Sequence, residues 1–118
     1  MKRDMDKARS VMLALEENDG PFFMTMDIPG LGDTEDGNEA AEYILMLQSA
    51  GYLESSQRHV YRISWAGHEF LDSVRDPEIW RKTKEGANKM GSWSMKLLGE
   101  LAIGFARMKA QELGLPLA

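Results

Sequence analysis

The sequence predicts an α+β fold, mainly α: a winged-helix-like domain with a small β-hairpin wing and a C-terminal helical extension. Apolar residues recur every three or four positions in four segments, which is typical of amphipathic helices. Between two of these segments, residues 52–63 hold two short apolar runs around a polar turn, which is typical of a hairpin. The length of 118 residues suits one domain. We assign residues 1–76 to the winged-helix-like domain and residues 77–118 to the extension, within one structural unit.

The first helix is predicted over residues 4–18, with Asp4 as its N-cap and a Gly-Pro pair after its end. The apolar run of residues 22–26 then predicts a short buried strand. Residues 27–38 are rich in glycine and acidic residues, so they predict a loop.

A second helix is predicted over residues 38–50 and is ended by Gly51. The hairpin follows, with strands at residues 52–54 and 59–63. The order helix, strand, loop, helix, hairpin, helix is that of a winged helix. In such a fold the hairpin is the wing, and the helix before it takes the place of the recognition helix.

Ser64 is expected to cap a third helix over residues 65–75. Trp65 opens this helix near Phe70 and Leu71, and we expect it to be a core residue. The other two tryptophans, Trp80 and Trp93, are equally compatible with the core and with an interface, because they lie in less regular segments.

The C-terminal part is expected to contain one further helix. Pro77 opens a short segment, and residues 82–91 are polar and loosely patterned. Ser94 then caps a helix over residues 95–113, which Gly114 ends.

Three stretches of the sequence are distinctive. Residues 1–6 read MKRDMD, residues 50–53 read AGYL, and residues 63–76 read ISWAGHEFLDSVRD, followed by Trp80. Together they resemble a bacterial and phage family, the domain of unknown function numbered 2513. The resemblance implies a winged-helix-like fold and a prophage or mobile-element setting, and it implies no particular activity.

Charge is distributed unevenly along the chain. Residues 1–9 carry a net charge of +2 and residues 58–118 a net charge of +3. Residues 10–57 carry ten carboxylates and no lysine or arginine, and the whole chain has a net charge of −5. Because nucleic acids are held mainly by lysine and arginine, the middle of the chain is better suited to binding a basic surface of another protein than to binding nucleic acid.

The sequence therefore predicts a non-enzymatic regulatory or interaction protein of bacterial or phage type. It would bind a protein partner through an acidic face, with inhibition of the partner as one form of this role. The acidic face consists of Asp33, Glu35, Asp36, Glu39 and Glu42. A simpler interpretation is that these carboxylates only keep a small domain soluble.

The alternative function is that of a DNA-binding winged-helix transcription regulator. The cations available for phosphate contacts are Lys2, Arg3, Lys7, Arg9, Arg58 and Arg62. The helix in the recognition position carries no cation, so we expect any DNA binding to be weak, independent of sequence and lost as salt rises.

No catalytic, cofactor or metal site is predicted. Ser64, His68 and Asp72 have helical spacing and could form a nucleophile, base and acid. A serine at a helix start is more often a cap, and a His–Asp pair four residues apart is more often a surface contact. His59 and His68 are the two histidines of the chain, and neither has a third ligand at a suitable spacing.

The last predicted helix favours a homodimer. Its apolar stripe needs a partner, either its own domain or a second copy, and twofold dimers are the commonest assemblies. The stripe consists of Leu98, Leu101, Phe105 and Met108. The chain lacks a signal-peptide pattern and an apolar run of about 20 residues, so we expect a cytoplasmic location without membrane contact.

Overall fold

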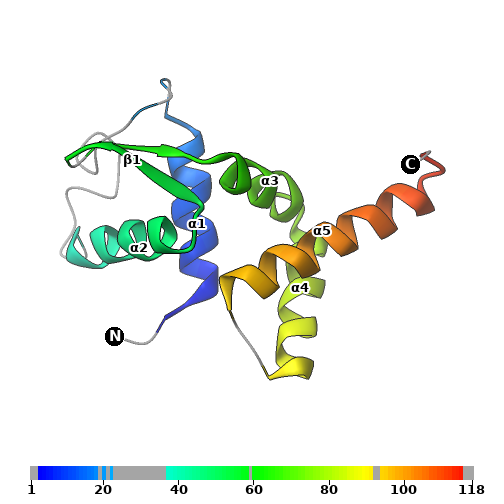
Figure 1. The fold of residues 1–118 in the computed structure, drawn as a ribbon. Coiled ribbons are helices and arrows are strands. Elements are labelled where there is room, and N and C mark those ends of the chain that lie inside the picture. Colours follow the sequence, from blue (N-terminus) through cyan, green and yellow to red (C-terminus); the bar gives the residue numbers. More distant parts are fainter. Residues whose placement is uncertain are drawn as a thin grey trace. The chain divides into compact units, whose positions relative to one another are not determined.

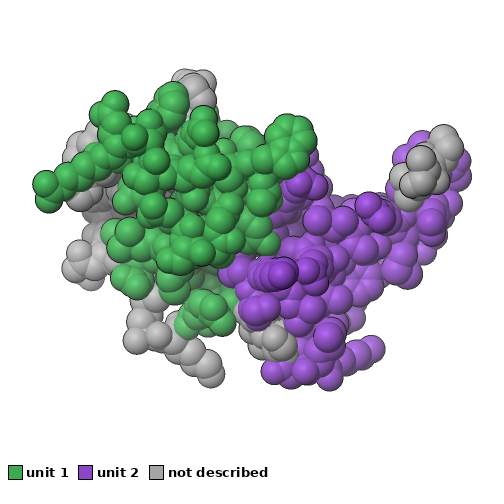
Figure 2. Space-filling model, viewed as in Figure 1, with its two compact units in different colours: residues 1–68 green, residues 69–118 purple. Residues whose placement is uncertain are grey.

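The computed structural model describes residues 3–18, 20, 22, 37–58, 60–91 and 94–115, with only the backbone described at 37–40. This part of the chain is mainly helical with one antiparallel hairpin, which confirms the predicted α+β, mainly α class (Figure 1). The elements are α1 (Met5–Glu16), α2 (Gly37–Ser49), β1 (Leu53–Gln57), β2 (Val60–Ile63), α3 (Trp65–Val74), α4 (Pro77–Met90) and α5 (Met95–Glu112). The chain divides within α3 into two compact units, residues 1–68 and 69–118 (Figure 2).

Helix α1 begins at a capped turn, as the sequence predicts. The Asp4 carboxylate accepts hydrogen bonds from the backbone N–H groups of Asp6 and Lys7, at 2.9 and 3.4 Å. The Asp4 N–H donates to the Tyr43 hydroxyl at 2.9 Å, which ties the start of α1 to α2. The apolar face of α1 is buried and packs against α2; it consists of Met5, Ala8, Val11, Met12 and Leu15.

Helix α2 leads directly into the hairpin. Gly51 follows it with φ of 87°, a left-handed conformation that glycine adopts without strain. Strand β1 packs against α2 and pairs with β2 in antiparallel register, with Leu53 opposite Ile63 and Glu54 opposite Arg62. Tyr43, Ile44, Leu47 and Leu53 are buried, so the core of the first unit joins α1, α2 and β1.

The predicted strand at residues 22–26 and the loop at 27–38 fall almost entirely outside the described residues. Phe22 is described, and it is exposed and in no regular element. The winged-helix assignment depends on the element order through this region, so it stays a prediction.

Residues 77–90 form helix α4, and the prediction of a short, loosely patterned segment was wrong. Asp76 caps the helix by accepting from the N–H groups of Glu78 and Ile79, and Pro77 stands in the first turn, where no N–H partner is required. Gly91 ends the helix with φ of 68°. The helix has few large apolar residues, and two i,i+4 ion pairs support its polar face: Glu78–Lys82 and Arg81–Glu85.

Helices α4 and α5 pack against each other in the second unit. Ser94 caps α5, as predicted, by accepting from the Leu97 N–H at 3.1 Å. The Gly86 backbone on α4 lies close to Leu101 and Phe105 of α5, because a Cβ placed there would be 3.5 Å and 3.8 Å from them. Leu98 and Ala102 are fully buried. The sequence pattern had indicated a stripe in need of a partner, and α4 supplies much of that cover.

The tryptophans differ in burial, and the one expected in the core is exposed. Trp65 is 81% exposed, so its assignment to the core was wrong. A helix turns by about 100° per residue, which places Trp65 opposite the buried Phe70, Leu71 and Val74 of α3. Trp80 is 4% exposed and meets Phe70 edge to face, with ring centroids 6.3 Å apart. Trp93 lies outside the described residues.

Candidate binding site

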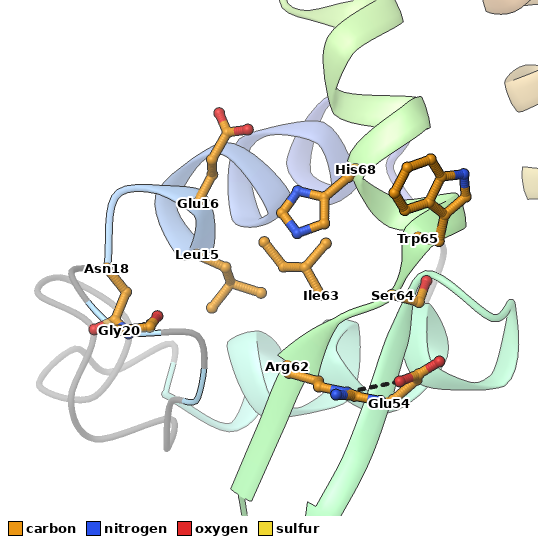
Figure 3. A pocket seen from close by; sticks show the side chains of 10 residues that line it. All are labelled: Leu15, Glu16, Asn18, Gly20, Glu54, Arg62, Ile63, Ser64, Trp65 and His68. Atoms are coloured by element: carbon orange, nitrogen blue, oxygen red, sulfur yellow. Dashed lines mark hydrogen bonds and ion pairs between the residues drawn. The ribbon is translucent and has the colours of Figure 1, made fainter.

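The first unit contains a pocket of about 560 Å³ between the end of α1, the hairpin and the start of α3 (Figure 3). Its walls combine apolar, aromatic and charged side chains. They are Leu15, Glu16, Asn18, Gly20, Glu54, Arg62, Ile63, Ser64, Trp65 and His68. A concave site with an apolar floor and a few polar groups is typical of ligand and side-chain recognition.

Ser64 fixes the start of α3 beside the hairpin. Its N–H donates to the Tyr52 carbonyl at 3.0 Å, and its hydroxyl donates to the Gly51 carbonyl. The hydroxyl oxygen also accepts from the Gly67 N–H at 3.0 Å, which is the N-cap bond predicted for this residue. Ser64 is buried, so its hydroxyl is used in holding α3 to the segment that precedes β1.

Gly67 allows α3 to approach the hairpin this closely. A Cβ at this position would overlap the Tyr52 carbonyl oxygen and lie 2.8 Å from the Cγ2 of Ile63. Only glycine fits against a backbone carbonyl at such close range. The contact sets the position of the first turn of α3, which carries Trp65 and His68.

The end of α1 supplies another wall of the pocket. Leu15 is buried there, and Glu16 follows it at the last position of the helix. The Asn18 side-chain amide donates to the carbonyls of Gly20 and Phe22 at 3.0 and 3.1 Å, which holds the chain in a turn just beyond α1.

The hairpin contributes a cross-strand ion pair. The Nε of Arg62 lies 2.7 Å from the Oε2 of Glu54, and both side chains are about half exposed. Exposed pairs of this kind add little to the free energy of unfolding. The pair matters here for the charge of the pocket, because the guanidinium of Arg62 is already paired with a carboxylate of the same chain.

Helix α3 places Trp65 and His68 at the pocket. They are three residues apart, so they share one face of the helix. In Figure 3 their rings lie on one side of Ile63 and the Arg62–Glu54 pair on the other. His68 is exposed.

The residues predicted as an acidic face are only partly described. Asp33, Glu35 and Asp36 lie outside the described residues. Glu39 belongs to α2, where only its backbone is described, and Glu42 is exposed one turn further along the helix.

The residues predicted for nucleic-acid contacts are dispersed. Lys2 lies outside the described part of the chain, while Arg3 and Lys7 are exposed and Arg9 is half-buried near the start of α1. Arg58 is exposed at the turn of the hairpin. Arg62 is the sixth, and its ion pair with Glu54 reduces what it could offer to a phosphate.

Two of the three side chains weighed for catalysis, Ser64 and Asp72, have other partners. Ser64 is the cap of α3, and the Asp72 carboxylate pairs with Arg75 at 3.2 Å. Among the residues that the structure describes, no three His, Cys, Asp or Glu side chains come together in a way that could hold a metal ion. His59 is not among them.

The stripe predicted for self-association is divided by depth. Leu98 is fully buried, and Leu101 and Phe105 are half-buried next to Gly86 of α4. Met108 is 54% exposed. Leu113, which follows the helix, is also exposed. Only the C-terminal end of the predicted stripe therefore presents an apolar surface.

The sequence reasoning missed the pocket itself. Leu15, Glu16 and Asn18 are more than thirty residues from Glu54 and Arg62, and nothing in their spacing indicates that they meet. A detectable signal was present in α3: the helical period places Trp65 on the face opposite the apolar residues, which marks an exposed aromatic.

The described helices and the mixed pocket define the class: a small, mainly helical protein with a β-hairpin and a surface site. The chain belongs to the family described as Hypothetical protein (DUF2513), whose model matches residues 2–93. An uncharacterized protein of Haemophilus influenzae is 34% identical over 94 residues, covering 71% of this chain and 76% of that protein. No solved structure matches the chain. The family match ends before α5, so it includes the pocket and α4.

None of the described helices combines the length and the apolar character that a membrane span requires.

Proposed function

We propose that the chain is a non-enzymatic interaction protein that binds a basic surface of a partner protein through the acidic face of α2 and the residues before it. The observation that carries the proposal is the stretch of residues 10–57, with ten carboxylates and no lysine or arginine. Such a stretch generates a negative field that speeds encounter with a basic partner and repels polyanions.

The described residues support this proposal in two places. Glu42 is exposed on α2, so its charge is available to a partner. Arg62, a basic group that lines the pocket, is paired with Glu54 across the hairpin at 2.7 Å. Because Arg62 is already paired with Glu54, its positive charge does little to offset the other carboxylates of this stretch.

DNA binding is the second candidate, and one observation favours it. Arg58 is exposed at the turn of the hairpin, which is the position from which a wing contacts phosphates. Against it, the described side chains of α2 include no cation, so base reading from that helix lacks its usual groups. We expect at most weak binding that disappears as salt rises.

The proposal includes a bacterial or phage setting, a regulatory or inhibitory role, a cytoplasmic location and a homodimer. The bacterial setting is supported by the relative in Haemophilus influenzae. The homodimer is supported by the exposed apolar end of α5 at Met108.

Charge reversal tests the acidic face. The variant Glu39→Lys/Glu42→Lys should lose capture of its partner from a bacterial lysate, measured by quantitative mass spectrometry, while its melting temperature changes little. The matched control is Glu100→Lys/Glu112→Lys, which makes the same change of charge at exposed positions of α5 and should retain the partner. Equal capture by both variants would contradict the acidic face. Tight, sequence-selective DNA binding at physiological salt would overturn the proposal as a whole.

A further inference from the structure

We propose that the pocket of the first unit binds one lysine or arginine side chain of a partner protein. This inference rests on the proposed function and names its anchor: one basic residue inserted between α1, the hairpin and α3. Nothing in the acidic face requires such a pocket, so the two ideas can fail separately.

The floor of the pocket suits the stem of a long basic side chain. Leu15 and Ile63 are apolar and line the cavity, which holds about 560 Å³. Lysine and arginine bury their methylene chains on apolar surface while the charged end stays near water. A short polar side chain would leave this apolar surface uncovered.

The charge at the pocket selects a cation. The lining includes two carboxylates, those of Glu16 and Glu54, and one guanidinium, that of Arg62. Arg62 is held by Glu54 at 2.7 Å, so it is poorly placed to attract a negative ligand. The lining residues thus include one more carboxylate than guanidinium groups, which disfavours an incoming phosphate or carboxylate.

Trp65 gives the pocket an aromatic wall. An 81% exposed indole is unusual for the largest side chain of a small protein, and its place opposite the buried face of α3 shows that the core does not use it. Tryptophan is the best aromatic partner for a cation and is enriched among the residues that dominate interface affinity. An arginine in the pocket could stack on this ring.

A peptide titration followed by NMR tests the assignment. The probe is the capped tripeptide acetyl-Gly-Arg-Gly-amide, with the lysine, norleucine and glutamate analogues as comparisons, added to the full-length ¹⁵N-labelled chain. We expect saturable shifts of the Trp65 indole N–H and the His68 amide, with millimolar affinity for arginine and lysine. Norleucine and glutamate peptides should produce much smaller shifts.

Variants connect these shifts to the proposed groups. Trp65→Leu should weaken the arginine peptide about fivefold, which is the size of one exposed cation–π contact. Glu16→Gln should also weaken it and reduce the effect of salt. The matched control is Leu45→Ala, which removes an exposed apolar side chain from α2 and should leave the affinity unchanged.

The possible results separate the pocket from the acidic face. Shifts centred on Trp65 and His68 that diminish in Trp65→Leu and Glu16→Gln support the pocket. Shifts centred on Glu42, equal binding of the norleucine or glutamate peptide, or the absence of any shift would overturn it. If Trp65→Leu keeps full partner capture while Glu39→Lys/Glu42→Lys loses it, the pocket assignment fails and the proposed function stands. If the reverse holds, the acidic face fails.

Discussion

The Lys109 ammonium on α5 lies against the Asp76 carboxylate, the same group that caps α4. One side chain thus completes the first turn of one helix and binds the last turns of the next. The hydrogen bond from Lys109, followed by the backbone N–H of Glu78, lowers the pKa of Asp76. The same bond raises the pKa of Lys109.

Asp76→Asn should lower the melting temperature at neutral pH, because asparagine keeps the cap but loses the charge that Lys109 binds. The lowered pKa of Asp76 means that its contribution is present above the pKa of the unfolded carboxyl and is lost as the pH falls through the folded-state pKa. Lys109 contributes below the pKa of the unfolded ammonium and loses its contribution as the pH rises through its raised pKa. The difference in melting temperature should therefore be constant near neutrality and shrink in acid.

Thermal melts of the unmodified chain, Asp76→Asn and Asp76→Ala across the acid range check this prediction. Asp76→Ala should be the least stable because it also loses the cap. If the Asp76→Asn difference stays constant into strong acid, the pair with Lys109 does not act as described.

Gly67→Ala should destabilise the protein by about 1–3 kcal/mol, as expected for forcing atoms into a packed site. The new Cβ would overlap the Tyr52 carbonyl and push against Ile63. Denaturant unfolding measures the change in free energy.

Gly104→Ala is the matched control, because Gly104 lies within α5 with no neighbouring atom within 4 Å of a Cβ. It should stabilise the protein by about 0.5–1 kcal/mol through helix propensity alone. Similar effects of the two substitutions would contradict the close approach of α3 to the segment before β1.

Trp80→Ala should cost about 3–5 kcal/mol, since it empties a buried site next to Phe70. Trp65→Ala should change the free energy of unfolding by no more than about 0.5 kcal/mol, as is usual for exposed positions. This is the reverse of the order that the sequence suggests. A larger loss for Trp65 than for Trp80 would mean that the exposed indole has a structural role.

Met108→Glu should shift any dimer toward monomer, because Met108 is the exposed part of the predicted stripe. Light scattering of the full-length chain over a range of concentrations measures the association. Leu98→Ala is unsuitable for this test, since Leu98 is fully buried and its truncation would destabilise the fold itself. A monomer at every concentration in the unmodified chain would contradict self-association through α5.

The sequence pattern predicts elements well where one apolar face is continuous. The predicted helices α1, α2 and α5 are confirmed. Their ends could be predicted because Asp4 and Ser94 are clear start signals and Gly51 is a clear end signal. Helix α4 was missed because only Ile79 and Trp80 are large and apolar in its buried face. Its Asp-Pro start and Gly91 end were visible in the sequence and indicated a helix.

The pocket could not be predicted in the same way. Its walls come from the end of α1 and the turn after it, from Glu54 of β1, and from the segment between Arg62 and His68. No repeating pattern in the sequence joins these parts. The Gly67 contact with Tyr52 depends on where α3 meets the hairpin, and the Arg62–Glu54 pair depends on the strand register. Tertiary packing determines both, and local sequence carries no record of it.

The stretch of residues 10–57 without lysine or arginine has a further consequence for chemistry at the bench. Trypsin cuts after Arg9 and next after Arg58, so the unfolded chain releases most of α1, all of α2 and all of β1 as one long peptide. Lysine-directed cross-linkers and acylating reagents have no target in this stretch. The stretch is instead rich in carboxylates, so carbodiimide coupling to an amine reports which of them a partner covers.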